Sequence, residues 1–350
     1  MQKTISGATF RKMVLAGVSL LEQNKEYVDS LNVFPVPDGD TGTNMFLTMK
    51  SAVTEVNKCM NNDIVALSEA FSKGALRGAR GNSGVITSQI FKGFCSVTQG
   101  CKEITTKDFA KAMQEGATVA YKAVTKPKEG TILTVIRVMA ENAVNLAKKH
   151  DDFETFLRKV CDTGEEILKQ TPEMLPVLKK AGVVDSGGRG ILVIFTGFMR
   201  YINGEEDLEY VFEDETKSQT VDDVIADINN LGEIEFGYCT EYLIINMHKK
   251  TTEADIDKLR ERLMEIGDSV ICIGDLSLVK VHVHTNEPNK ALGYALELGE
   301  LDRPKIENML EQNRQIRAKM EAEKKEMGML AICAGAGLAD IFKDLGVDRI

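Results

Sequence analysis

The sequence lacks the features of several familiar classes of protein. It has no basic run with interleaved aromatic residues, and its formal net charge of -10 and pI near 5.2 argue against a nucleic-acid-binding surface. No signal-peptide apolar core follows the first basic residues, and the longest apolar run, Ile191 to Phe195, is far too short to cross a bilayer. The seven cysteines contain no C-x-x-C pair and do not form a disulfide framework. We therefore expect a cytoplasmic protein without a membrane span.

The first part of the chain, residues 1–203, is a succession of helical patterns joined by short loops. Ser6 can cap the first helix. The further patterns lie near 44–59, 64–78, 84–97, 107–124, 131–149, 153–169 and 188–202. This arrangement predicts an all-α antiparallel bundle of about eight or nine helices.

The composition changes after Asn203. An acidic linker is expected over 204–233, followed by a mixed α/β (α+β) middle domain over 234–326. Strands are predicted near 238–247, 269–273 and 278–285, and helices near 253–266 and 289–298, with a charged helix over about 305–326. Residues 327–350 have the pattern of the start of a further βα domain that is unfinished at Ile350. We expect the chain to be cut from a longer protein.

The segment from Asn32 to Asn44 is the most informative part of the sequence. Pro35 and Pro37 hold its first part extended, and Asp38-Gly39-Asp40 places two carboxylates on an adaptable backbone that can wrap a hard cation. Pro-Asp-Gly is also ordinary turn chemistry. Helical sequence resumes at Asn44, however, and a helix N-terminus favours anions. The segment therefore predicts a Mg²⁺ site that handles phosphate.

Three further glycine-rich segments each precede a helical pattern: Arg80 to Gly84, Lys128 to Thr131, and Asp185 to Gly190. Each alone is more often a helix cap than a phosphate site. Neither a G-x-x-x-x-G-K-[ST] loop nor a dinucleotide fingerprint in a βαβ context occurs. Four such segments in one all-α domain favour a nucleotide site built from helix N-termini.

A second constellation lies in the middle domain. His282 and His284 alternate on one predicted strand, so both face the same side, and Cys239 lies on a preceding strand. Cysteine with two histidines is a reasonable zinc set with one position open. The alternative is two half-buried histidines and a core cysteine, and the residues alone leave both interpretations open.

Residues 1–203 resemble the nucleotide-binding L-subunit domain of dihydroxyacetone kinases, and the whole chain resembles the bacterial fatty acid kinase catalytic subunit. The motifs that carry this resemblance are Asn32 with Phe34 to Gly42, Gly81 to Gly84 with Ser88-Gln89, Glu129 to Leu133, Asp185 to Gly188, Tyr238 to Glu241, and Lys280 to Asn286. Dihydroxyacetone kinases carry a further Asp before the Asp pair and a His directly after it. Here no acid closely precedes Asp38, and Thr41 follows Asp40.

The resemblance implies an eight-helix antiparallel barrel that binds ATP and two Mg²⁺ ions at one end. It implies that Asp38 and Asp40 are catalytic metal ligands, and that Asn32 supplies the oxygen of the missing acid. The implied nucleotide contacts are Thr41, Gly42, Thr43, Asn44, Asn82, Ser83, Gly84, Thr131, Asp185, Ser186 and Gly187. It also favours zinc at Cys239, His282 and His284.

The implied reaction is transfer of the γ-phosphate of ATP to a fatty acid carboxylate, which gives an acyl phosphate for phospholipid synthesis. The lipid would arrive on a separate fatty-acid-binding carrier protein, and the middle domain could pair with itself in a C2 homodimer. Two alternatives remain open. One is a kinase of a small hydroxylated molecule such as dihydroxyacetone, and the other is a nucleotide-binding regulatory scaffold without catalysis.

Overall fold

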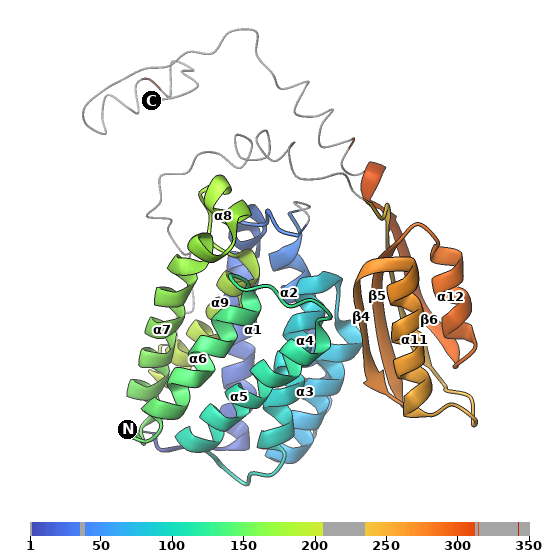
Figure 1. Cartoon of the computed structure of the whole chain (residues 1–350). Coiled ribbons are helices and arrows are strands. Elements are labelled where there is room, and N and C mark those ends of the chain that lie inside the picture. The colour runs from blue at the N-terminus through green and yellow to red at the C-terminus, as the bar shows by residue number, and fades with distance from the viewer. Residues whose placement is uncertain (1, 36–38, 206–234, 312–313, 315–341, 343–350) are drawn as a thin grey trace. The chain divides into compact units, whose positions relative to one another are not determined.

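The computed structural model describes residues 2–35, 39–205, 235–311, 314 and 342 (Figure 1). Residues Met1–Met309 form one compact unit, and this unit is described here. Asp38, nearly all of the predicted linker over 204–233 and nearly all of the predicted βα start over 327–350 lie outside the described residues. Within the described part of the chain, no helix has the length and apolarity needed to cross a bilayer.

Eight helices of the described residues form a closed antiparallel ring. They are α1 (Gly7–Ser30), α2 (Thr41–Lys58), α3 (Ile64–Gly78), α4 (Gly81–Thr98), α5 (Thr106–Ala123), α6 (Ile132–Leu146), α7 (Phe153–Met174) and α9 (Ser186–Ile202). Each packs against the next, and α9 packs against α1. A short helix, α8 (Pro176–Ala181), lies between α7 and α9, and two short strands, β1 (Thr4–Ile5) and β2 (Ile104–Thr105), pair antiparallel. The predicted eight-helix antiparallel fold is confirmed.

Local sequence explains where these helices begin, and buried aromatic side chains explain why they associate. Ser6 caps α1 by accepting a hydrogen bond from the backbone N–H of Thr9, as predicted. Inside the ring, the buried rings of Phe71 and Phe91 pack edge to face with centroids 5.2 Å apart, and Phe91 also packs against Phe195. Buried aromatic pairs of this kind contribute beyond the area that they remove from water.

The alternation of helix directions brings the starts of α2, α4, α6 and α9 to one end of the ring, the end at which α8 lies (Figure 1). The loop after α1 is anchored at this end, because Val33 packs with Val177 and Leu178 of α8. The Lys128 ammonium lies 5.0 Å from the centroid of the Phe34 ring. All four glycine-rich segments singled out in the sequence therefore lie at the same end of the bundle.

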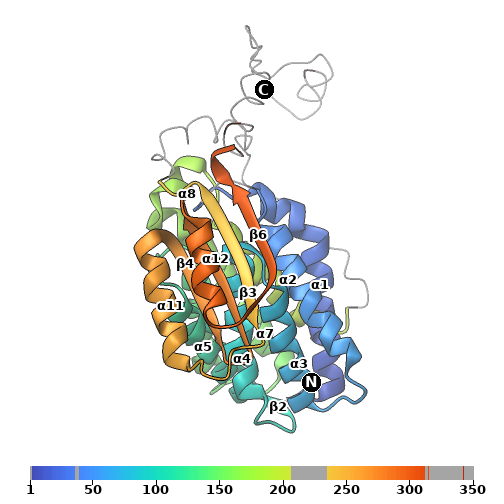
Figure 2. The same ribbon diagram turned by 90° about the vertical axis from the view of Figure 1, so that its right-hand side faces the viewer.

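The middle region forms a four-stranded antiparallel sheet in the order β4-β5-β3-β6. Its strands are β3 (Tyr238–Ile245), β4 (Gly267–Asp275), β5 (Leu278–Thr285) and β6 (Glu300–Asn308). Two helices, α11 (Glu253–Ile266) and α12 (Pro288–Leu296), cover one face of the sheet (Figure 2). On that face, Tyr242, Val281 and Leu263 are part of a buried apolar core.

The helix predicted over 305–326 is wrong at its start. Residues up to Asn308 belong to β6, which pairs antiparallel with β3 from Ile245–Glu300 to Tyr238–Asn308. The sequence of β6 has no apolar alternation, so its strand character comes from pairing with the edge of β3. Pro304 and the positive φ of Arg303 suit an edge strand. Most of the rest of the predicted helix lies outside the described residues.

Candidate active site

The starts of α2 and α4 contact each other. The Ser83 hydroxyl donates a hydrogen bond to the Thr41 carbonyl over 3.3 Å. Gly81 has a φ of 55°, and a Cβ there would lie 2.5 Å from Nδ2 of Asn44, so the position requires glycine. A Cβ on Gly84 would lie 2.3 Å from Oγ1 of Thr48. The structure thus brings the segment from Thr41 to Asn44 together with the segment from Gly81 to Gly84.

The two residues predicted as Mg²⁺ ligands that the structure describes differ in exposure. Asp40 directly precedes α2, is partly exposed, and makes no capping hydrogen bond to the helix. Asn32 is buried at 4% exposure, and its backbone N–H donates to the Asp29 carbonyl. A partly exposed carboxylate beside a helix N-terminus fits a hard cation that also binds phosphate. Asp40 is therefore better placed as a ligand than Asn32.

Asp29 is an acid that the sequence analysis overlooked. It lies in the last turn of α1, and its two carboxylate oxygens accept hydrogen bonds from the backbone N–H of Thr43 over 3.0 Å and from the Thr43 hydroxyl over 2.6 Å. Partial burial raises the pKa of Asp29, although the hydrogen bonds from Thr43 oppose this. Asp29 is not close to Asp38 in sequence, but its bonds to Thr43 fix the first turn of α2 and bring an acid to this site in space.

The starts of α6 and α9 form a second pair. The buried Asp185 carboxylate accepts hydrogen bonds from the backbone N–H of Gly188 over 2.7 Å and from the backbone N–H of Ile132. A Cβ on Gly187 would lie 3.1 Å from Cβ of Ile132. The Thr131 hydroxyl donates to the Lys128 carbonyl. Asp185 thus holds two helix N-termini together, and its burial raises its pKa to about 7.

This buried acid leads to a stability prediction. The pKa of Asp185 is higher in the folded protein than its ordinary value of 3.8, so the folded state binds the proton more tightly than the unfolded state. Its contribution to stability is full below pH 3.8 and falls as the pH rises through about 7. We therefore expect the free energy of unfolding of wild type to fall by up to about 4 kcal/mol through this titration. Asp185→Asn should abolish that fall. Urea unfolding between about pH 5 and pH 8 measures it.

The matched control for this experiment is Asp151→Asn, which changes an exposed aspartate in an ion pair with Lys3. An exposed pair of this kind contributes little to stability, so this variant should keep the wild-type pH profile. If Asp185→Asn and wild type lose stability in parallel across this pH range, Asp185 does not titrate as described.

The two faces of the sheet differ in chemistry because side chains alternate along each strand. On β5, Val279, Val281 and Val283 face the helix-covered core, and Lys280, His282 and His284 face the other side. On β3, Cys239 lies opposite His284 and Glu241 lies opposite His282. One face of the sheet therefore carries a polar cluster made of Cys239, Glu241, Lys280, His282 and His284.

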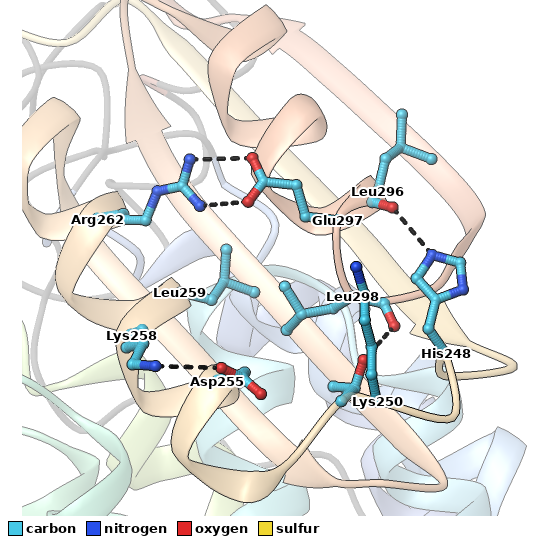
Figure 3. A pocket seen from close by; sticks show the side chains of 10 residues that line it. His248, Lys250, Asp255, Lys258, Leu259, Arg262, Leu296, Glu297 and Leu298 are labelled. Atoms are coloured by element: carbon cyan, nitrogen blue, oxygen red, sulfur yellow. Dashed lines mark hydrogen bonds and ion pairs between the residues drawn. The ribbon is translucent and has the colours of Figure 1, made fainter.

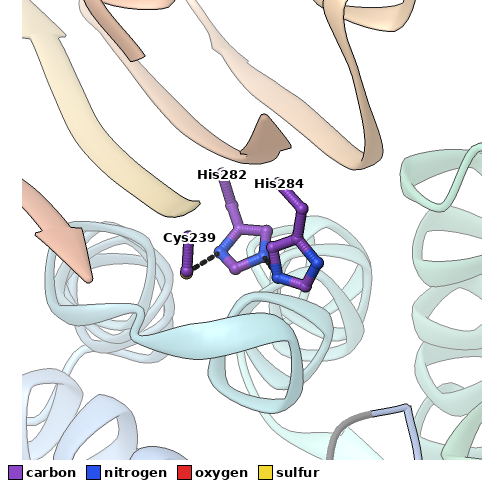
Figure 4. A group of neighbouring side chains, drawn as sticks. All are labelled: Cys239, His282 and His284. Atoms are coloured by element: carbon purple, nitrogen blue, oxygen red, sulfur yellow. Dashed lines mark hydrogen bonds between the residues drawn. The ribbon is translucent and has the colours of Figure 1, made fainter. Parts of the chain in front are cut away.

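Three members of this polar cluster have the geometry of a metal site. The Nε2 atoms of His282 and His284 are 3.2 Å apart. Sγ of Cys239 lies beside the His282 ring, 3.8 Å from its other nitrogen, Nδ1. One ligand atom from each residue can be chosen so that all three lie within 4.8 Å of one another (Figure 4). Two nitrogen ligands of a tetrahedral Zn²⁺ lie about 3.3 Å apart. The donor set therefore fits zinc with one position open.

Glu241 and Lys280 complete the polar cluster, and the sequence analysis did not single them out as site residues. The Glu241 carboxylate lies 2.8 Å from Nδ1 of His282 and accepts a hydrogen bond from Nζ of Lys280 over 2.9 Å. Burial alone would raise the pKa of Glu241, but the hydrogen bonds and charges of His282 and Lys280 outweigh it and hold this pKa well below its usual range. Burial and the neighbouring His282 lower the pKa of His284 to about 3.

The polar face of the sheet contacts the corner between α3 and α4. The backbone N–H of Gly81 donates to Oε1 of Glu241 over 2.8 Å. Beside this bond, Leu76, Ala79 and Val85 of the helical region pack with Ile271 and Ile273 of β4. The cluster therefore adjoins the glycine-rich start of α4.

A hollow of about 590 Å³ lies in the middle region, away from the polar cluster (Figure 3). It is lined by His248, Lys250, Thr251, Asp255, Lys258, Leu259, Arg262, Leu296, Glu297 and Leu298. Arg262 is paired with Glu297 at 2.7 Å, and Lys258 with Asp255 at 3.3 Å. These charges satisfy one another, so the hollow is a poor candidate for the chemistry.

Comparison with known proteins gives two family matches in order along the chain. Residues 35–200 match the model of the DAK2 domain, and residues 235–316 match that of the FakA-like middle domain of fatty acid kinases. Protein YloV of Bacillus subtilis (strain 168) is 43% identical over 364 residues, which cover 99% of this chain and 65% of that protein. An uncharacterized protein of Staphylococcus epidermidis is 42% identical over 357 residues, which cover 99% and 64%.

The chain therefore spans about 65% of the length of these curated relatives. Among solved structures, the dihydroxyacetone kinase from C. freundii, in complex with AMP-PNP and Mg²⁺, matches with a TM-score of 0.43 at 14% sequence identity. That match covers 55% of this chain and 33% of the other.

Proposed function

We propose, on the premise that this chain belongs to the family that joins a DAK2 domain to a FakA-like middle domain, that it is the ATP-dependent phosphotransferase component of a fatty acid kinase. It transfers the γ-phosphate of ATP to the carboxylate of a fatty acid. A separate fatty-acid-binding protein presents that acid, and the products are an acyl phosphate and ADP.

The observation that carries this proposal is the gathering of glycine-rich helix starts at one end of the DAK2 region. The starts of α2 and α4 contact each other through Ser83 and Thr41, and the starts of α6 and α9 are joined through Asp185. The first N–H groups of a helix have no partner within the helix, and they favour anions. Carboxylates of Asp29, Glu241 and Asp185 already accept from one or two N–H groups at these starts, so the other N–H groups of the first turns would face the phosphates. A set of such starts is suited to holding the phosphates of a nucleotide.

The chemistry requires little of the protein beyond position and charge. A fatty acid carboxylate is already ionised near pH 7, so its attack needs no general base. A carboxylate oxygen forms a bond to the γ-phosphorus while the bond between that phosphorus and the bridging oxygen breaks, and ADP leaves with the electron pair. The helix N-termini would stabilise the charge that develops.

Two kinds of metal ion are part of the proposal. Asp38 and Asp40 would hold Mg²⁺, because the partly exposed Asp40 carboxylate beside α2 fits an ion that shares its shell with phosphates. Bound Mg²⁺ would neutralise phosphate charge. Cys239, His282 and His284 would hold Zn²⁺, which would fix the polar face of the sheet in one geometry. We also propose that the middle domain pairs in a C2 homodimer.

A transfer assay tests the proposed reaction. The chain would be mixed with ATP, Mg²⁺ and an oleate-loaded fatty-acid-binding protein, and acyl phosphate would be trapped with hydroxylamine as a hydroxamate. We expect hydroxamate and ADP with the loaded carrier and neither with the lipid-free carrier. ADP formation with dihydroxyacetone instead would assign the small-molecule kinase. Nucleotide binding without turnover in every mixture would favour the regulatory scaffold.

A further inference from the structure

We propose that Glu241 is a positioning residue for phosphoryl transfer, because its carboxylate links the first turn of α4 to the zinc-type set of Cys239, His282 and His284. The link holds that set beside the start of α4. This inference rests on the proposed kinase function for its role in turnover, but the link itself can be measured without any substrate.

Three groups from two distant parts of the chain converge on this one carboxylate. Oε1 of Glu241 accepts the hydrogen bond from the Gly81 backbone N–H and lies 2.8 Å from Nδ1 of His282, while Oε2 accepts the hydrogen bond from Lys280. Glu241 and Gly81 are 160 residues apart in sequence. Glu241 is 6% exposed, so water does not compete strongly for these bonds. Charge-assisted hydrogen bonds of this kind are strong and directional.

Glu241 also determines how His282 is turned. Because Nδ1 of His282 faces Glu241, its Nε2 faces Nε2 of His284 at 3.2 Å. A carboxylate on one ring nitrogen commonly fixes the orientation in which the other nitrogen binds its ligand. One side chain therefore positions both the start of α4 and the histidine pair.

The buried polar network around Glu241 is not needed simply to hold the helical region and the sheet together. Apolar contacts beside it, among them Val85 with Ile271 and Ile273, already hold the surfaces together. Burying a glutamate, a lysine and a histidine in the same interface carries a desolvation cost that apolar residues would avoid. The network is better explained by positioning, because it fixes where the polar cluster lies relative to the Gly81 N–H.

Hydrogen exchange at the Gly81 amide tests the link in the whole chain without nucleotide. Gly81 is the first residue of α4, so its N–H has no partner within the helix, and its protection depends on Glu241. We expect Glu241→Ala to speed exchange at this amide by at least about tenfold. Glu241→Gln keeps an acceptor oxygen and should retain most of the protection. Unchanged exchange in Glu241→Ala would overturn the proposal.

Steady-state kinetics distinguish a positioning role of Glu241 from a role in nucleotide binding. In the transfer assay, Glu241→Ala should lower kcat roughly 10- to 100-fold and leave KM for ATP within about twofold, with partial rescue in Glu241→Gln. Glu297→Ala is the matched control, because it removes a glutamate from an exposed ion pair with Arg262 in the same region. A raised KM with unchanged kcat, or tighter ATP binding in Glu241→Ala, would contradict the positioning role. If wild type transfers no phosphate, the proposed function fails, and exchange at Gly81 still decides the link.

Discussion

Asp40→Ala should abolish phosphoryl transfer while leaving the fold intact. The Asp40 carboxylate lies just before α2, is partly exposed, and makes no capping bond to that helix, so its removal should change the free energy of unfolding by less than about 0.5 kcal/mol. Phosphates bridged by Mg²⁺ would lose a ligand of their metal. We expect the transfer rate to fall by about 1,000-fold or more, and Asp38→Ala to have the same effect.

Asp151→Ala is the control for this loss, because Asp151 is an exposed aspartate paired only with Lys3 among the contacts described for it. Its transfer rate should equal that of wild type. Rates are measured as hydroxamate formation with the loaded carrier, and unfolding as a urea transition. Full activity in the Asp38→Ala/Asp40→Ala double variant would show that these carboxylates do not hold the catalytic metal.

The helical region could be predicted from sequence because its signals are local. Ser6 caps α1 where expected, and Asp185 opens α9 by accepting from Gly188. Caps and the 3.6-residue period depend on residues a few positions apart. Antiparallel alternation then follows from short loops. The gathering of the glycine-rich segments at one end is a consequence of that alternation.

The features that were missed or mispredicted depend on contacts between distant residues. The strand β6 has a polar sequence and becomes a strand by pairing with β3. Asp29 is recognisable only when the end of α1 lies beside Thr43. Glu241 and Lys280 are recognisable as site residues only once β3 pairs with β5 and the Gly81 N–H lies beside them. The alternation of Lys280, His282 and His284 with valines was the available signal, since it places three polar groups on one face.

The second prediction with a large expected effect is the zinc content of the protein, which depends on Cys239, His282 and His284. We expect protein purified without chelator to carry about one Zn²⁺ per chain, and Cys239→Ala and His284→Ala each to lose it. The three ligand atoms lie within 4.8 Å of one another, and His282 and His284 are 1% and 7% exposed on the face of the sheet opposite its apolar core. Nε2 of His282 and Nε2 of His284 face each other at 3.2 Å, an arrangement that a shared Zn²⁺ would explain.

Metal analysis of wild type and variants measures this, and Cys101→Ala is the matched control. Cys101 follows α4, and its partly buried thiol donates to the Val97 carbonyl in the last turn of that helix. It belongs to no described group of metal-binding residues, so its loss should leave the zinc content unchanged. Replacement by Co²⁺ adds a spectroscopic check, because a thiolate ligand gives a charge-transfer band that Cys239→Ala should abolish. Zinc that is absent from wild type, or retained in both Cys239→Ala and His284→Ala, would return these three residues to a role in packing.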